Sequence, residues 1–332
     1  MEWIAGDIGG TKSWLVWIGP PGDGLHPRFE RVYPSADFVS AEALLRQFLA
    51  DSGIQGRPDG LILAVAGPSQ AEHVKLTNLD WWIDAAELQL ALGIPQVHIV
   101  NDFEAAAAGL ATLVPADYVE INPGQPDPLG VRAITGAGTG LGLAFLVHDP
   151  AGRETSYPTE GGHVDFAPAN AMQDRLLKRL RKQYGHVSWE RVVSGSAMSE
   201  LYAFCCVELG TTPCSASCDG ACLVAAAAAD DIAAEAALDL FVDLYGAWVG
   251  NVALLYRPRG GLYIAGGVSA HLQKRIAAPR FMAAALDKGR MRRVVESTPI
   301  FLITSPRLGV QGALALREAA AHSRRDRRTH ER

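Results

Sequence analysis

Two glycine-rich turns, each preceded by an apolar run, constrain this sequence more than any other feature. The first apolar run, Trp3-Ile4-Ala5, leads into Gly6-Asp7-Ile8-Gly9-Gly10-Thr11-Lys12. The second, Val131-Arg132-Ala133-Ile134, leads into Thr135-Gly136-Ala137-Gly138-Thr139-Gly140-Leu141-Gly142. Glycines at this spacing let backbone N–H groups converge on an oxyanion, although a single glycine turn can also simply join a hairpin. Two such turns predict a phosphate that is gripped from both sides.

Neither turn matches the common nucleotide-binding motifs. The chain contains no Gly-x-x-x-x-Gly-Lys-Ser/Thr sequence and therefore no P-loop. A dinucleotide-binding turn opens a helix, whereas Gly136-x-Gly138-x-Gly140 leads into a second apolar run that is typical of a strand. The second turn is therefore expected to join two strands.

Strands and helices alternate along the chain, which indicates an α/β protein. Its 332 residues, 48% of them hydrophobic, suffice for two domains. Ser40 predicts the start of one helix, and Asp84 with Glu87 predicts a capping box at the start of another. Strands are expected at 3–7, 13–18, 28–33, 60–66, 97–100, 131–135, 143–148, 260–265 and 298–304, and further helices at 103–113, 172–184, 188–193, 197–209, 231–256 and 310–320. We expect two sheet-based domains with the active site in the cleft between them.

The charge balance argues against nucleic acid and membrane as partners. The net charge is −6, whereas both partners attract a basic face. The basic stretches 178–182 and 324–332 are interpreted as a solvated helix face and a frayed terminus. No secretory signal is expected, and no apolar run is expected to span a membrane because Asp230, Asp231 and Glu235 interrupt the alanine-rich stretch. We therefore expect a cytoplasmic protein.

All five cysteines lie in one short region: Cys205, Cys206, Cys214, Cys218 and Cys222. The last three share a Cys-x-x-x-Cys-x-x-x-Cys spacing that raises the question of a zinc site. The spacing differs from the usual Cys-x-x-Cys pairing, and no histidine is close in sequence. We therefore predict reduced thiols in an irregular segment rather than a metal site.

Asp7 is an unusual residue to find in a phosphate-binding turn. A carboxylate beside a phosphate would repel the ligand unless a cation lay between them. Magnesium held through water by Asp7 resolves that conflict. A hairpin aspartate with no ligand is the alternative interpretation.

Asn101 and Asp102 come at the end of an apolar run and at the start of an expected helix. In open α/β sheets this edge is where ligands bind. An amide beside a carboxylate can clasp a polyol, and the carboxylate can accept the proton of an attacking hydroxyl. The alternative is that one of the two residues only caps the helix.

Three further polar residues and a glycine pair lie in loops later in the chain. Glu160 and His163 flank two glycines that would bring both side chains to one side of a tight turn. Glu190, in a short helical stretch, would by itself be interpreted as a surface residue. Gly266 and Gly267 follow an apolar run and either let a ligand approach the backbone or form a plain strand-to-helix turn.

Taken together, these residues resemble the bacterial glucokinases of the hexokinase, actin and sugar-kinase superfamily, from Asp7 to about Leu316. The resemblance rests on Asp7-Ile8-Gly9-Gly10-Thr11, Leu76-Thr77-Asn78-x-x-Trp81, Asn101-Asp102-Phe103-x-Ala105, Gly136-Ala137-Gly138-Thr139-Gly140-Leu141-Gly142, Glu160-Gly161-Gly162-His163-Val164-Asp165-Phe166, Glu190-Arg191-Val192-x-Ser194-Gly195 and Ile264-Ala265-Gly266-Gly267. It implies an enzyme that transfers the ATP γ-phosphoryl group to the 6-hydroxyl of glucose, at the entry to glycolysis, with Mg²⁺.

The resemblance also assigns roles to residues. It implies that Asp102 is the catalytic base and that Asn101, Asp102, Glu160, His163 and Glu190 bind the sugar hydroxyls. The nucleotide would be held by Gly6, Asp7, Ile8, Gly9, Gly10, Thr11, Gly136, Gly138, Thr139 and Gly140, with Gly266 and Gly267 near the adenosine. It further implies a small domain of residues 1–113 and 305–322, a large domain of residues 114–304, and a homodimer. Residues 323–332, in the basic terminus interpreted above as frayed, are expected to form a disordered tail.

Some positions depart from the family pattern, and alternatives remain open. Lys12 stands where many members carry asparagine, and the cysteines do not match the zinc motif of the related repressor and open-reading-frame kinases. No DNA-binding helix-turn-helix precedes the first strand, so a repressor is not expected. A kinase for another hexose or an N-acetylated amino sugar, a polyphosphate donor, and a silent sugar-binding regulator stay possible.

Overall fold

The protein is an α/β chain that divides into two compact units. A computed structural model describes residues 1–19, 27–67, 73–76, 79–213 and 218–317. Unit 1 comprises Met1–Val114 and Ser305–Arg332, and unit 2 comprises Pro115–Thr304. The first unit is therefore built from two separate stretches of chain.

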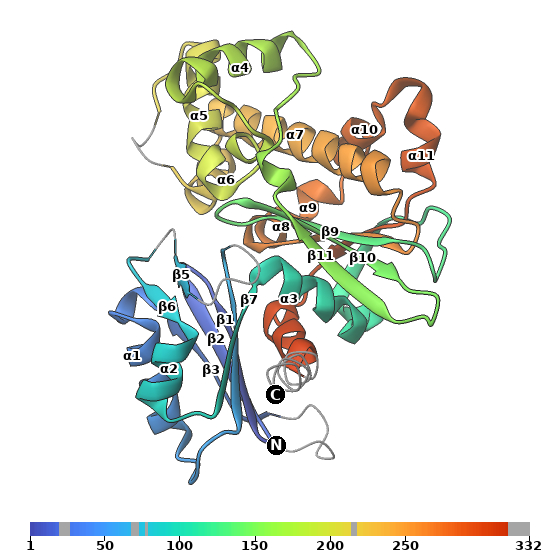
Figure 1. Ribbon diagram of the computed structural model, residues 1–332. Helices are drawn as coiled ribbons and strands as arrows, with labels where there is room; N and C mark the ends of the chain where they lie inside the picture. The colour runs from blue at the N-terminus through green and yellow to red at the C-terminus, as the bar shows by residue number, and fades with distance from the viewer. Residues whose placement is uncertain (20–26, 68–72, 77–78, 214–217, 318–332) are drawn as a thin grey trace. The chain divides into compact units, whose positions relative to one another are not determined.

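A five-stranded sheet with the order β3-β2-β1-β4-β7 forms the centre of unit 1 (Figure 1). Its strands are β1 (Trp3–Ile8), β2 (Lys12–Ile18), β3 (Pro27–Pro34), β4 (Gly60–Val65) and β7 (Gln96–Asn101). The first three are antiparallel neighbours, whereas β4 is parallel to β1 and β7 is parallel to β4. A separate hairpin pairs β5 (His73–Lys75) with β6 (Trp82–Asp84).

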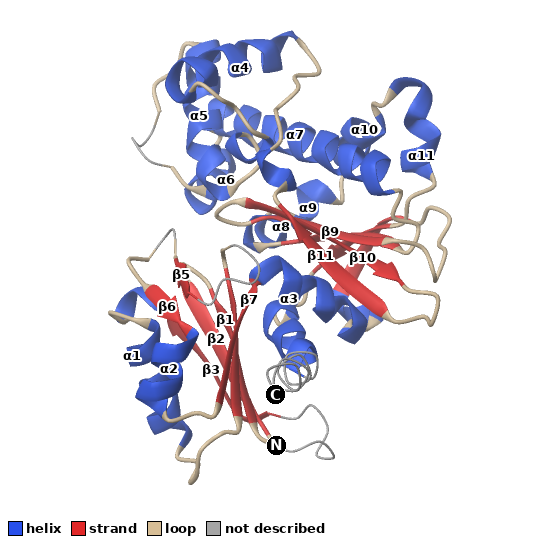
Figure 2. Ribbon diagram, viewed as in Figure 1, coloured by secondary structure: helices blue, strands red, loops and turns tan. Residues whose placement is uncertain are grey.

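Helices cover both faces of this sheet. One face packs against α1 (Ala41–Ser52) and α2 (Ala85–Leu92) through an apolar cluster that includes Leu44, Phe48 and Leu88. The other face packs against α3 (Asp102–Gly109) and the helical residues 308–317 through a second cluster. Figure 2 shows the three layers, with the strands between the two pairs of helices. The carboxyl ends of β4 and β7 therefore lie at one edge of a sheet that is buried on both sides.

Unit 2 contains a six-stranded sheet with the order β11-β10-β9-β12-β13-β8. The strands are β8 (Tyr118–Asn122), β9 (Arg132–Ala137), β10 (Leu141–His148), β11 (Glu154–Thr159), β12 (Gly261–Ala265) and β13 (Ile300–Ile303). The helices of the unit are α4 (Ala171–Tyr184), α5 (Gly195–Leu209), α6 (Gly220–Ala228), α7 (Ile232–Tyr256), α8 (Gly267–His271), α9 (Gln273–Ile276), α10 (Pro279–Leu286) and α11 (Arg292–Glu296). The largest apolar cluster of the chain joins these helices to the sheet.

The long helix α7 corrects one expectation from the sequence. Its 25 residues have a mean hydropathy of 1.4 over the most apolar window, so by length and composition it could cross a membrane. However, 67% of that window is buried inside the protein. Leu238, Phe241 and Tyr245 are among its fully buried side chains. The acidic residues that seemed to interrupt the run lie at or before its first turn, and the helix beyond them is the apolar centre of unit 2.

Short 3₁₀ helices link the main elements of both units. They are η1 (Ser35–Asp37), η2 (Leu110–Thr112), η3 (Pro115–Asp117), η4 (Gly161–His163), η5 (Trp189–Arg191) and η6 (Gly289–Met291). The stretch expected as a helix at 188–193 is only the single turn η5. Two of these turns carry candidate site residues: η4 contains His163 and η5 contains Glu190. Short hydrogen-bonded turns therefore position both side chains.

Candidate functional site

The first glycine turn closes the hairpin between β1 and β2 in unit 1. Gly6 and Ile8 lie within β1 itself, so the tip of the turn is Gly9-Gly10-Thr11. The backbone N–H of Gly9 donates to the carbonyl of Lys12 at 3.1 Å. The N–H groups of Gly10 and Thr11 have no acceptor among the described residues. Two adjacent amides are therefore available at the tip, the arrangement of a small anion-binding nest.

Two buried serines hold this turn from behind. The Ser35 hydroxyl donates to the Gly9 carbonyl at 2.7 Å, and the Ser35 backbone N–H donates to the Thr11 carbonyl at 3.1 Å. Ser13 Oγ lies 2.9 Å from Ser35 Oγ, and both side chains are fully buried. Because the Ser35 proton is committed to Gly9, Ser13 is the donor of the pair. Reasoning from the sequence missed both serines.

Asp7 carries the most perturbed carboxyl group near the first turn. Burial raises the pKa of Asp7 to about 6, and the positive charge of Lys12 opposes that rise. A Cβ atom built on Gly309 would lie 2.4 Å from the Asp7 carboxylate. The backbone of the helical segment 308–317 can therefore pack against this carboxylate only because residue 309 has no side chain. A carboxyl with a pKa near neutrality is poised to take up or release a proton, or to respond to a cation.

Asn101 and Asp102 lie at the junction of β7 and α3, as expected. Asn101 is the N-cap: its Oδ1 accepts the backbone N–H groups of Phe103 at 2.9 Å and Glu104 at 3.0 Å. Its Nδ2 donates to the Gly67 carbonyl at 2.5 Å. The Asp102 carboxylate also accepts the Phe103 N–H at 2.9 Å and is only partly buried. The cap fixes Asn101, and the N-terminus of α3 favours a negative charge on Asp102.

The second glycine turn closes the hairpin between β9 and β10 in unit 2. Gly136 and Ala137 lie within β9, and the Gly138 N–H donates to the Gly140 carbonyl at 2.9 Å. Among the described residues, none accepts a hydrogen bond from the N–H groups of Thr139 and Gly140. The tip thus repeats the pattern of the first turn, with one closing bond and two adjacent amides left over. Its Gly138 carbonyl accepts the N–H of Gly195, which begins α5, at 2.7 Å.

The pair Gly266-Gly267 joins β12 to α8 beside the second turn. Gly266 has a φ of +95°, and a Cβ atom there would lie 2.4 Å from the Ala137 carbonyl oxygen. No larger residue fits this position without moving the backbone. Gly267, in contrast, faces open space. The strand-to-helix turn and the close backbone approach, which the sequence left as alternatives, are both present.

Glu160, His163 and Glu190 lie together in unit 2. His163 Nε2 is 3.8 Å from Glu160 Oε2, and His163 Nδ1 is 4.0 Å from Glu190 Oε1. The side chains of Glu160 and His163 are 79% and 59% exposed, so a ligand can reach them. Glu190 is less exposed, and its Oε2 accepts the Leu141 N–H of the second turn at 3.0 Å. One end of this carboxylate therefore contacts the glycine turn while the other faces the histidine.

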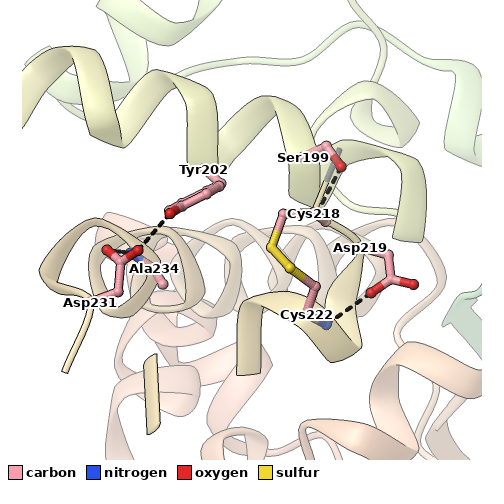
Figure 3. The surroundings of a disulfide bond; sticks show 7 residues. All are labelled: Ser199, Tyr202, Cys218, Asp219, Cys222, Asp231 and Ala234. Carbon is pink, nitrogen blue, oxygen red and sulfur yellow. Dashed lines mark hydrogen bonds between the residues drawn. A yellow bond between two sulfur atoms is a disulfide. The ribbon is translucent and has the colours of Figure 1, made fainter. Parts of the chain in front are cut away.

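The cysteine region differs from the sequence prediction. Cys218 and Cys222 form a disulfide across the start of α6, with their Cα atoms 5.2 Å apart (Figure 3). Cys205 and Cys206 are free and buried. The prediction of reduced thiols is therefore wrong for the first pair, because one turn at a helix start brings residues four apart within disulfide reach. Cys214 lies outside the described residues.

Other predicted features also fall outside the part of the chain that is described. These are Thr77 and Asn78 of the tryptophan motif and the tail from 318 onward. Within the described residues, no group of three or more histidine, cysteine or acidic side chains is arranged to hold a metal ion. A cation at Asp7 would therefore depend on the ligand and on water for its other contacts.

Comparisons with known proteins agree over nearly the whole chain. A family model described as Glucokinase matches residues 4–320. The curated glucokinase of Nostoc punctiforme is 37% identical, over 93% of this chain and 97% of that protein. A crystal structure of a glucokinase from an Antarctic psychrotroph is 32% identical and has a TM-score of 0.79, covering 95% of this chain and 98% of that one.

One more distant structure shares the fold. A glucokinase from Balamuthia mandrillaris, solved in complex with glucose, has a TM-score of 0.77 at 23% identity. The match covers 94% of this chain and 92% of that chain. At this identity the similarity concerns the fold alone.

Proposed function

The chain belongs to the glucokinase family, and from this premise we propose that it transfers the γ-phosphoryl group of ATP to the 6-hydroxyl of D-glucose. The products are glucose 6-phosphate and ADP, at the entry to glycolysis. We place the enzyme in the cytoplasm, where it acts on small molecules rather than on nucleic acid or a membrane. A homodimer remains a prediction from the family resemblance.

One observation carries this proposal beyond the family name. Glu190 contacts the second glycine turn with one carboxylate oxygen and lies beside His163 with the other. A cluster of hydrogen-bonding side chains suited to sugar hydroxyls is thus joined directly to a turn with two uncommitted amides. This is the neighbourhood that phosphoryl transfer from a nucleotide to a sugar requires.

The roles that we propose for individual residues are those that the family resemblance implies. The amides at the tips of the two turns would hold the phosphates, and Gly266-Gly267 would lie near the adenosine. Asn101, Glu160, His163 and Glu190 would bind the sugar hydroxyls. Asp102 would accept the proton of the 6-hydroxyl as the oxygen attacks the γ-phosphorus and the bond to the β-phosphate oxygen breaks.

Magnesium is the cation that we propose to accompany ATP. Asp7 fits this role because its carboxylate lies beside the tip of the first turn, where burial makes an uncompensated negative charge unfavourable. Asp7 would hold the ion through water. The cation would neutralise charge on the phosphate groups when bound.

The test of the proposed function is coupled detection of glucose 6-phosphate from glucose and ATP with Mg²⁺. Parallel reactions with mannose, fructose and N-acetylated amino sugars establish the acceptor, and polyphosphate in place of ATP establishes the donor. Glucose should give the highest kcat/KM, since a site that hydrogen-bonds several hydroxyls disfavours a sugar whose hydroxyls are missing, replaced or differently placed. A protein that binds glucose without producing ADP would contradict the proposal.

Replacing Glu160 by glutamine is expected to raise the KM for glucose by about 10- to 100-fold, because a neutral amide replaces the charged carboxylate as the partner of a sugar hydroxyl. The KM for ATP should change less than twofold. The Glu160 side chain is 79% exposed, so the melting temperature should hardly change. Asp165→Asn is the matched control, since its carboxylate is also exposed and lies only five residues along the chain. Equal glucose KM values for the two variants would contradict the role of Glu160.

The raised pKa of Asp7 predicts a pH dependence of the magnesium requirement. With a pKa of about 6, the carboxyl is mostly ionised at pH 7 and mostly protonated at pH 5, where it no longer attracts a cation. The Mg²⁺ concentration for half-maximal rate should therefore rise about tenfold from pH 7 to pH 5. Phosphate groups also titrate near pH 6, so Asp7→Asn supplies the baseline. If the Mg²⁺ concentration for half-maximal rate rises equally with falling pH in wild type and Asp7→Asn, Asp7 is not the magnesium-binding residue.

A further inference from the structure

A chain of buried hydrogen bonds connects helix α7 to both glycine segments of unit 2. The Ala137 N–H, at the start of the second turn, donates to the Tyr245 hydroxyl at 3.2 Å. Tyr245 Oη lies 2.9 Å from Ser269 Oγ, and Ser269 donates to the Ala265 carbonyl at 2.7 Å. Because the Ser269 proton is already committed, Tyr245 must be the donor to Ser269. Each of the two hydroxyls thus donates once and accepts once, and the chain runs in one fixed direction from the Ala137 N–H to the Ala265 carbonyl.

The two ends of this chain are the segments that the proposed function assigns to ATP. Ala137 precedes the tip Gly138-Thr139-Gly140, and Ala265 precedes the pair Gly266-Gly267. The Gly266 backbone also lies directly against the Ala137 carbonyl. The pairing of β9 with β12 holds the two segments side by side up to Gly136 and Ala265. The hydroxyls of Tyr245 and Ser269 bridge them again at Ala137 and Ala265, where both chains leave the sheet for the segments assigned to the nucleotide.

Trp248 supports the same turn one helical turn further along α7. Its indole N–H donates to Thr135 Oγ1 at 2.9 Å, and Thr135 donates to the Gly142 carbonyl at 2.8 Å. Residues three apart share one face of a helix, so one face of α7 holds both the start and the base of the turn. Tyr245, Trp248, Thr135 and Ser269 are each at most 1% exposed.

Packing alone does not explain the tyrosine hydroxyl. Phenylalanine would fill the same space among Phe241 and Phe281 without placing a polar group in an apolar core. Burial raises the pKa of Tyr245 to about 12, so the phenol keeps the proton that it donates to Ser269. A fully satisfied buried network of this kind restricts its members to one arrangement.

We propose that Tyr245 and Ser269 are positioning residues for ATP, which set the relative placement of the second glycine turn and the Gly266-Gly267 turn. The inference rests on the proposed function. Neither residue is proposed to touch the nucleotide or the sugar. Both act through the backbone of the residues on which the nucleotide lies.

The test separates KM for ATP from KM for glucose. Tyr245→Phe should raise the KM for ATP by about 5- to 30-fold. This range corresponds to the loss of one or two hydrogen bonds that hold the nucleotide-binding backbone in place. The KM for glucose, measured at saturating ATP, should change less than twofold. Tyr202→Phe is the matched control, because Tyr202 is also buried in unit 2 and its hydroxyl donates to Asp231, the N-cap of α7, rather than to either turn (Figure 3).

Ser269→Ala provides a second, smaller change and should raise the KM for ATP in the same direction. The double variant should lose little more than Tyr245→Phe alone, because the two hydroxyls belong to one chain. ATP KM values within twofold of wild type in both single variants, or an equal rise in Tyr202→Phe, would overturn the inference. If Tyr245→Phe does not fold, the KM for ATP of Ser269→Ala tests the inference by itself. If wild type makes no glucose 6-phosphate, the proposed function fails, and direct binding of a non-hydrolysable ATP analogue still tests the positioning role.

Discussion

Replacing Asp102 by asparagine is expected to lower kcat for glucose phosphorylation by about 10²–10⁴-fold, the usual range for loss of a positioned base. Asparagine keeps the shape and an oxygen that can accept the Phe103 N–H, as the carboxylate does at 2.9 Å. It cannot accept the proton of the 6-hydroxyl. The start of α3 should therefore remain intact, and the KM for glucose should change far less than kcat. Steady-state kinetics with coupled detection of glucose 6-phosphate measures both quantities.

Glu104→Gln is the matched control for this variant. Glu104 lies in the same helical turn, where burial raises its pKa and a hydrogen bond from the Asn101 backbone opposes that rise. Glutamine can still accept that bond, so kcat should stay within a few-fold of wild type. An Asp102→Asn protein with full activity would sink the assignment of the base. Equal losses in both variants would point to damage at the start of α3 instead.

Replacing Gly312 by alanine is expected to lower the free energy of unfolding by about 3 kcal/mol, at the upper end for overpacked sites. Gly312 lies in the helical residues 308–317, where alanine would ordinarily stabilise a helix by about 1 kcal/mol. Here the added Cβ atom would lie 1.6 Å from the Ala105 carbonyl of α3, and Gly109 of α3 contacts the same helix. The two helices would have to separate, which a drop of several degrees in melting temperature would reveal.

Ala315→Gly, on the exposed side of the same helix, measures the propensity effect alone. It should cost about 1 kcal/mol with no change in packing. One variant replaces glycine by alanine and the other replaces alanine by glycine. Both are expected to lower the free energy of unfolding, and Gly312→Ala should lower it more. An alanine at 312 that raises the melting temperature would show that the helices tolerate a wider spacing.

The fold class was predictable because its signals act over a few residues. The two-domain α/β fold of the hexokinase and actin type is confirmed by the TM-score of 0.79 to a glucokinase structure. Ser40 and Asp84 cap α1 and α2 as expected, and α7 occupies nearly the whole of the stretch predicted as a long helix. Apolar runs and capping residues of this kind need no information from distant parts of the chain.

Strand β11 is an element that local sequence signals do not predict. Its sequence Glu-Thr-Ser-Tyr-Pro-Thr carries a proline and few apolar residues, and it was not predicted. It lies at the edge of its sheet, where only pairing with β10 makes it a strand. The short strands β5, β6 and β8 were missed for a similar reason, since each has three to five residues with few buried side chains.

The candidate site also contains features that are local in the sequence and features that depend on tertiary packing. The glycine turns and the Glu160–His163 turn are local in sequence, and the structure places each in a tight turn. The proximity of Glu190 to His163 depends on the packing of η4 and η5, so no local pattern predicts it and only the family resemblance grouped the two residues. The hydroxyls of Ser35, Tyr245 and Ser269 were missed because a buried hydroxyl on a core element looks like any other residue until its partners are known.

The helical residues 308–317 have a consequence for how the protein is made. They cover one face of the unit 1 sheet together with α3, and Gly309 lies against Asp7. A ribosome synthesises Asp7 before unit 2 and this helix only after the whole of unit 2. Until then the apolar residues Ile62 and Ala64 on that face lack part of their cover. The first glycine turn therefore obtains its final surroundings only after unit 2 has been synthesised, so a chain that terminates within unit 2 would lack the backbone that lies behind Asp7.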